Sequence, residues 1–332
     1  MATAVWRRSS RRVTIDAAPP DPLPVVLDEA SDESLSSWLK RHAQFYGVAP
    51  SAFSRRVGID RLTLARINHH LTAGAARTLA TVMRRSPMEI ASMTHQQQED
   101  RLAPMIARGE TAQACSECQQ RHRRDNRPTV VLKSWSQGWR ITCPVCGSRL
   151  QDANRGEVRP PSDAFEHVWE EARSGEELLT NIEHLAADRA AFVMALLQLL
   201  LLRRSRARSD SQRQIDRGRV LDVVVPGFDD VDRSAPFTIN GATPLVVPLT
   251  IRIALLAALS RTQNDPDLYK RMESSCSGRE SIRFDAVKIK LLADAHPSFS
   301  YLQQIRDSSP FWSRHFQRRP TETGAVSRFR AE

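Results

Sequence analysis

The sequence predicts a mainly α-helical protein with one small cysteine-rich β element. Apolar residues recur at helical spacing between Leu35 and Phe45. Longer apolar stripes recur from about Ser162 onward, and the segment between these regions, roughly 108–152, holds four of the five cysteines. With 332 residues, 41% of them hydrophobic, the chain can build two or three domains with a sizeable core.

Composition and helical period divide the chain into four parts. We expect a flexible tail at 1–24, a helical domain at 25–98, the cysteine segment within 99–160, and a mostly helical domain at 161–332. In the last domain, residues 163–173, 176–208 and 249–261 should be helical, 220–248 irregular with a short strand, and 308–320 a short aromatic helix. The apolar run 190–202 is too short to span a bilayer and indicates a buried helix.

The first predicted helix begins near Ser31, which can cap its N-terminus. Its apolar stripe should consist of Leu35, Trp38, Leu39 and Phe45. Gly47 follows the stripe and is expected to end the helix.

Residues 50–69, PSAFSRRVGIDRLTLARINH, fit a helix-turn-helix pattern. Gly58 lies where the tight turn needs positive φ, and Ser54 is small enough for close helix approach. The positions that should face inward are Phe53, Val57, Ile59, Leu64 and Ile67. The second helix would be capped by Asp60.

That second helix would present Arg61, Leu62, Ala65 and Arg66 outward, with Thr63 beside them. In a DNA-binding helix-turn-helix, such residues contact base edges in the major groove. An ordinary helical hairpin uses the same packing, so both interpretations stay open here.

The four clustered cysteines form two Cys-x-x-Cys pairs, Cys115/Cys118 and Cys143/Cys146. Two such turns can place four thiolates tetrahedrally around one metal ion. TVVLKSW at 129–135 and WRIT at 139–142 suggest a β-hairpin between the pairs, with Trp139 and Ile141 on one face. The pattern predicts a zinc ribbon with one structural Zn²⁺, because four cysteines leave no open coordination position.

A rubredoxin-like iron centre and a thioredoxin-like redox pair are the alternatives for these cysteines. The basic stretch between the pairs disfavours an electron-transfer site. Its arginines are either phosphate contacts or solvated side chains: Arg121, Arg123, Arg124 and Arg127.

A formal net charge of +10 points to an anionic partner, most often nucleic acid. The motifs of a P-loop ATPase, a dinucleotide enzyme and a serine hydrolase are absent from the sequence, so we expect no enzyme. Cysteines in metal-type pairs suit a reducing cytoplasm, and neither a secretory signal nor a membrane partner is expected.

The order of motifs resembles the TniQ family of transposition targeting proteins, which is related to TnsD. Residues 23–53 contain ESLSSWL, which is similar to the family's opening helix, and 78–94 end in its Met-Thr pair. CPVCGSRL at 143–150, with Trp139 shortly before, is similar to the family's C-P-x-H-x-x-x-L knuckle. Cys146 stands where the family usually has histidine, and the second Cys-x-x-Cys pair of many members is missing.

The resemblance implies a non-enzymatic DNA-targeting adaptor of transposition, a component of a mobile element's DNA integration. Its partners would be DNA, an AAA+ ATPase regulator and a transposase. A guide-RNA complex and a homodimer stay open. The alternatives are a sequence-specific helix-turn-helix transcription regulator and a metal-dependent redox enzyme.

Overall fold

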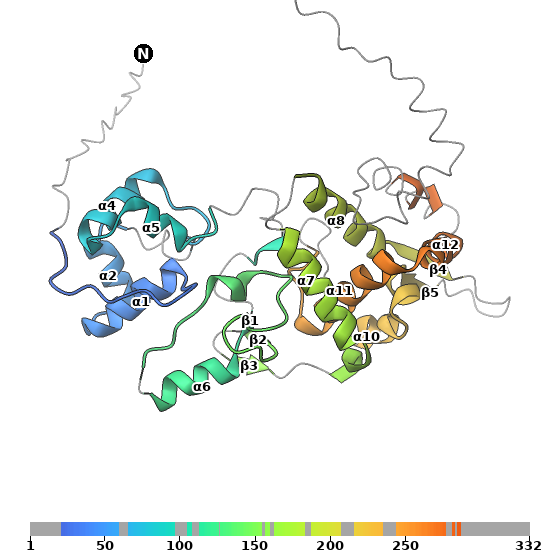
Figure 1. The fold of residues 1–332 in the computed structure, drawn as a ribbon, viewed down its shortest axis with the longest axis horizontal. Coiled ribbons are helices and arrows are strands. Elements are labelled where there is room, and N and C mark those ends of the chain that lie inside the picture. The colour runs from blue at the N-terminus through green and yellow to red at the C-terminus, as the bar shows by residue number, and fades with distance from the viewer. Residues whose placement is uncertain are drawn as a thin grey trace, which may run out of the picture.

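Two groups of helices dominate the fold, and the cysteine segment lies between them (Figure 1). The structure, a computed structural model, is mainly α-helical, as the sequence predicts. It describes residues 21–59, 66–96, 105–107, 113–125, 127–154, 157–159, 163–182, 187–206, 216–234, 244–276, 281–282 and 284–286.

The N-terminal group is a small bundle. It contains α1 (Leu35–Phe45), α2 (Pro50–Arg56), α4 (Ala73–Met83) and α5 (Pro87–Ser92). The apolar side chains that hold it together include Leu35, Trp38, Leu39, Phe53, Ile67, Leu79 and Ile90. Ser86 and Glu89 form a capping box at the start of α5, which fixes the α4–α5 turn.

Helix α1 begins later than predicted. Its N-cap is Ser34, whose hydroxyl accepts a hydrogen bond from the Ser37 amide, so the predicted cap at Ser31 is wrong. The reason lies just before the helix, where Asp32 has a φ of 59° and Glu33 forms a β-bridge with Leu132. Both conformations are incompatible with a helical first turn.

The end of α1 follows the prediction in part. Gly47 has a φ of 63°, as expected for a residue that ends a helix. Phe45 was predicted to join the apolar stripe, but its side chain is 53% exposed. It lies edge-on to Tyr46, whose ring turns back toward the bundle and stacks on Phe53.

The turn after α2 has two features that the helix-turn-helix pattern predicts. Gly58 has a φ of 77°, and Ser54 is buried. Phe53, Val57, Ile59 and Ile67 are buried as predicted. Residues 60–65, among them Asp60, Arg61, Thr63 and Leu64, lie outside the described residues, so the second helix stays a prediction.

His42 lies in the core of the N-terminal bundle. The Leu27 amide donates to its Nε2 at 2.9 Å, and its Nδ1 lies 2.8 Å from the Trp38 carbonyl oxygen. A carbonyl can only accept, so Nδ1 carries the proton of a neutral ring. Burial lowers the pKa of His42, which favours this neutral form.

The cysteine segment combines short strands with one helix. It contains β1 (Gln113–Ala114), α6 (Ser116–Arg124), the 3-10 helix η2 (Lys133–Ser136), β2 (Gln151–Asn154) and β3 (Glu157–Arg159). The three strands form an antiparallel sheet in the order β1-β2-β3. The predicted small β element is therefore present, but strands outside the two cysteine pairs build it.

The predicted hairpin of residues 129–135 and 139–142 is wrong. Lys133–Ser136 form η2, and the flanking residues pair with distant segments: Leu132 with Glu33, and Gln137 with Ile106. These bridges supply the backbone partners that a hairpin would have supplied. Trp139 and Ile141 nevertheless share the buried side, as predicted.

The C-terminal group forms a larger helical body. It contains the 3-10 helix η3 (Asp163–Val168), α7 (Trp169–Ile182), α8 (Ala187–Leu200), α9 (Leu221–Val224), α10 (Phe228–Ser234), α11 (Leu249–Asn264) and α12 (Pro266–Ser274). Its core also takes in Met105, Ile106, Trp139 and Ile141 from the cysteine segment. The segment thus packs directly onto this body.

Several element limits differ from the sequence-based expectation. The predicted helix 176–208 extends too far, because α8 ends at Leu200 and is followed by strand β4 (Arg203–Arg206), which pairs with β5 (Asp216–Arg219). Residues 220–248 contain α9 and α10 rather than irregular chain, because Leu221, Val224 and Phe228 are buried against the body. The apolar run 190–202 lies mostly in α8, and its described side chains are largely buried, as expected. Residues 308–320 lie outside the described residues.

Within the part of the chain that the structure describes, none of the helices has the length and apolarity required to cross a membrane.

Candidate metal centre and basic surface

The first cysteine pair lies where a strand turns into a helix. Strand β1 ends at Ala114, Cys115 is the N-cap of α6, and Cys118 lies in the first turn of that helix. A helical first turn points residues three apart to the same side, so both thiols face one point.

The second cysteine pair lies on a tight turn. Gly147 has a φ of 75°, and its amide donates to the Cys143 carbonyl at 2.8 Å. The Cys143 amide donates to the Ser148 carbonyl at 2.8 Å, which closes the turn. Glycine suits this place, because other residues rarely adopt positive φ.

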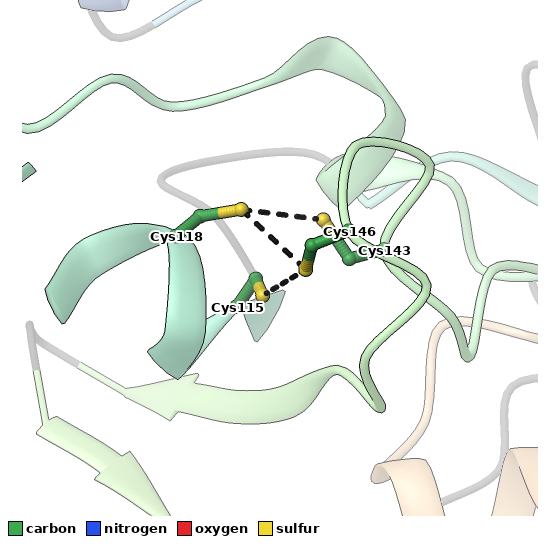
Figure 2. A group of neighbouring side chains, drawn as sticks. All are labelled: Cys115, Cys118, Cys143 and Cys146. Carbon is green, nitrogen blue, oxygen red and sulfur yellow. Dashed lines mark hydrogen bonds between the residues drawn. The ribbon is translucent and has the colours of Figure 1, made fainter. Parts of the chain in front are cut away.

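The two pairs meet, as Figure 2 shows, and the four sulfur atoms all lie within 4.8 Å of one another. The Sγ–Sγ distances are 3.4 Å for Cys115–Cys146, 3.7 Å for Cys118–Cys143 and 3.6 Å for Cys118–Cys146. A tetrahedron with metal–sulfur bonds of about 2.3 Å has edges of about 3.8 Å. These three edges are therefore near the size that a bound metal ion requires.

The same distances bear on the alternatives. A disulfide needs an S–S distance of about 2.05 Å, and all of these cysteines are free thiols. The three contacts each join one pair to the other, which makes a single group of four ligands rather than two separate redox pairs. Four cysteines close together can hold a metal ion, and their number leaves no open position for a substrate.

The electrostatics of the cluster link metal binding to proton release. Burial raises the pKa of Cys115 to about 12 and also raises that of Cys118. Burial also acts on Cys146, but hydrogen bonds from the Ser148 hydroxyl and amide outweigh it and lower the pKa to about 7. Because only thiolates bind metal, the two thiols whose pKa is raised must release their protons when an ion binds.

Helix α6 carries a basic end away from the cysteines. Arg121, Arg123 and Arg124 lie in its last turn and are exposed. Arg127 is exposed too, 3.9 Å from the Asp125 carboxylate. Cations at a helix C-terminus are favoured by the helix dipole, so the dipole alone accounts for part of this arrangement.

Among the arginines whose side chains the structure describes, ion pairing differs between the two halves of the chain. Exposed arginines without an ion pair gather before residue 128: Arg55, Arg56, Arg66, Arg77, Arg84, Arg121, Arg123 and Arg124. After residue 139 the arginines pair with carboxylates, with Arg203 as the exception: Arg140, Arg149, Arg173, Arg219, Arg233, Arg252, Arg261 and Arg271. The uncompensated positive charge therefore lies on the N-terminal bundle and α6.

The structure describes some of the residues predicted to contact DNA and not others. Arg66 is exposed, and Arg61 and Thr63 lie outside the described residues. The sequence does not single out four further exposed arginines that have no ion pair: Arg55, Arg56, Arg77 and Arg84. Neighbouring residues in the sequence do not show which arginines lack a carboxylate partner, because ion pairs such as Arg85–Asp28 join residues far apart in the chain.

The fold and this site define a mainly helical protein with a tetracysteine centre. Residues 24–152 match the model of the TniQ family. A TniQ segment indicates a transposition-associated protein. Comparisons with curated proteins and with solved structures found no match.

Proposed function

We propose that this protein is a non-enzymatic, DNA-targeting adaptor of transposition that acts in the cytoplasm. It would link target DNA to an AAA+ ATPase regulator and a transposase. The observation that carries the proposal is the TniQ match over residues 24–152, together with the unpaired arginines that lie almost entirely within the same range.

The charge distribution supports DNA as the partner of the N-terminal half. DNA phosphates attract arginines that have no carboxylate partner, because no internal ion pair must be broken first. Arg121, Arg123 and Arg124 would contact phosphates, and Arg127 would exchange its 3.9 Å ion pair with Asp125 for such a contact. Arg61, Thr63 and Arg66 would reach base edges from the second helix of the helix-turn-helix.

A structural Zn²⁺ at the four cysteines completes the proposal. Zinc accepts four thiolates in a tetrahedron, and one ion would hold the turn of Cys143 and Cys146 against the start of α6. The ion would supply folding free energy and no chemistry. The C-terminal body would then offer its surface to the protein partners.

Salt dependence of DNA binding tests the contact of α6. We expect the triple variant Arg121→Ala, Arg123→Ala, Arg124→Ala to flatten the plot of log affinity against log salt, by roughly 0.9 for each lost phosphate contact. Fluorescence anisotropy with labelled duplex DNA at several salt concentrations measures this slope.

A matched control uses three exposed arginines of the C-terminal body that have carboxylate partners: Arg173, Arg233 and Arg271. Their replacement with alanine should leave the slope as in the wild-type protein. If the two triple variants behave alike, α6 does not contact DNA, and its arginines are solvated charges.

A further inference from the structure

Strands β1 and β2, which flank the cysteine pairs, bring two side-chain hydrogen-bond acceptors next to each other. Gln113 and Asp152 are directly opposite each other in the β1–β2 ladder. Gln113 lies two residues before Cys115, and Asp152 follows the turn that carries Cys143 and Cys146. Each strand thus belongs to a different half of the candidate metal centre.

One buried guanidinium of the C-terminal body contacts both acceptors. Arg252 lies in the first turn of α11, and its side chain is 2% exposed. Its Nη1 donates to the Gln113 side-chain oxygen and, at 3.2 Å, to the Arg140 carbonyl. Its Nη2 donates to Asp152 Oδ1 at 3.2 Å. A buried charge of this kind is stable only while its partners stay in place.

Asp152 also accepts a hydrogen bond from the backbone at the start of α11. Pro248 is the N-cap and offers no side-chain acceptor, and the Leu249 amide donates to the Asp152 carboxylate at 2.9 and 3.0 Å. A carboxylate at this position is favoured by the helix dipole as well. The cysteine segment therefore caps the central helix of the C-terminal body.

The β1–β2 pair is too short to persist by itself. Strand β1 has two residues, so the ladder has few hydrogen bonds of its own. A metal ion shared by Cys115, Cys118, Cys143 and Cys146 would tie the ends of both strands together. Without it, the place of Gln113 beside Asp152 would depend on this short ladder, on Arg252 and on the bond from Gln113 Nε2 to the Gln137 carbonyl at 2.9 Å.

We propose that Gln113, Asp152 and Arg252 transmit the metal state of the tetracysteine centre to the C-terminal body. When the metal is bound, the body is docked and α11 is capped. When it is lost, Arg252 loses acceptors and the N-terminus of α11 opens. This inference rests on the metal site proposed above. Because linkage is reciprocal, breaking the contact at Arg252 must also weaken metal binding.

Zinc affinity of the full-length chain tests the proposal. We expect Arg252→Met to raise the zinc dissociation constant about tenfold, within the range usual for coupled sites. Asp152→Asn, which keeps the shape and an acceptor for Leu249, should act in the same direction. Competition with a chromophoric chelator measures both. In the wild-type protein, hydrogen exchange at Leu249 should become faster when the chelator removes zinc.

Arg219→Met is the matched control, because Arg219 is also buried in the C-terminal body and pairs with Asp232. It should lower the stability of the body and leave zinc affinity unchanged. The coupling is overturned if the wild type, Arg252→Met and Asp152→Asn bind zinc with equal affinity. It is also overturned if Arg219→Met loses as much zinc affinity as Arg252→Met. A wild-type chain that binds no zinc overturns the metal site itself, which is a different result.

Discussion

Replacing Cys143 with serine should abolish stoichiometric zinc binding and unfold the segment between β1 and β2. Cys143 is buried, and its sulfur lies 3.7 Å from that of Cys118, so its loss opens the group of four ligands. The binding free energy of a structural zinc is folding free energy, typically about 10–16 kcal/mol in small zinc domains. Elemental analysis would measure the metal, and hydrogen exchange of the backbone amides would measure the unfolding.

Cys276→Ser is the control for this experiment, because Cys276 lies outside the cluster. It should keep about one zinc ion per chain, the content expected of the wild-type protein. Iron in the purified wild-type protein would contradict the assignment of zinc. A segment that stays protected after chelation would contradict a structural role for any metal.

Gly175→Ala should strongly destabilise the C-terminal body. Gly175 is buried in α7 where this helix crosses α11, and an added Cβ would lie 2.1 Å from the Leu256 carbonyl oxygen. That atom belongs to the backbone, so the helices themselves must separate. Overpacking typically costs about 1–3 kcal/mol, and we expect a value at or above the upper end. Thermal unfolding followed by circular dichroism would measure the loss.

Gly74→Ala provides the comparison, since Gly74 lies in helix α4 with no atom within 4 Å of an added Cβ. Alanine there should be neutral or stabilise by roughly 0.5–1 kcal/mol, because it restricts the unfolded chain. Equal melting temperatures for the two variants would show that α7 and α11 do not pack this closely.

Features that depend on neighbouring residues could be predicted from the sequence. The spacing of Cys115, Cys118, Cys143 and Cys146 identified the cluster, because each Cys-x-x-Cys turn orients two thiols locally. Gly58 could be placed for the same reason, since a tight turn needs positive φ at one residue.

Features that depend on distant partners could not be predicted. The hairpin expected from residues 129–135 and 139–142 is wrong because Leu132 pairs with Glu33, far earlier in the chain. Arg252 and Gln113 are 139 residues apart, and nothing local marks either one as buried. The burial of His42 could not be predicted either, because the amide that donates to its Nε2 belongs to Leu27, which lies outside helix α1, while the Trp38 carbonyl accepts from its Nδ1.

The central claim is that this protein directs transposition, and integration of a marked element tests it most directly. Insertions would be mapped in cells that carry the transposase and the ATPase, with and without this protein. We expect frequent insertions at a restricted set of sites when it is present, and few or scattered ones when it is absent. The same number and distribution of insertions in both cases would contradict the targeting role and leave the transcription-regulator alternative.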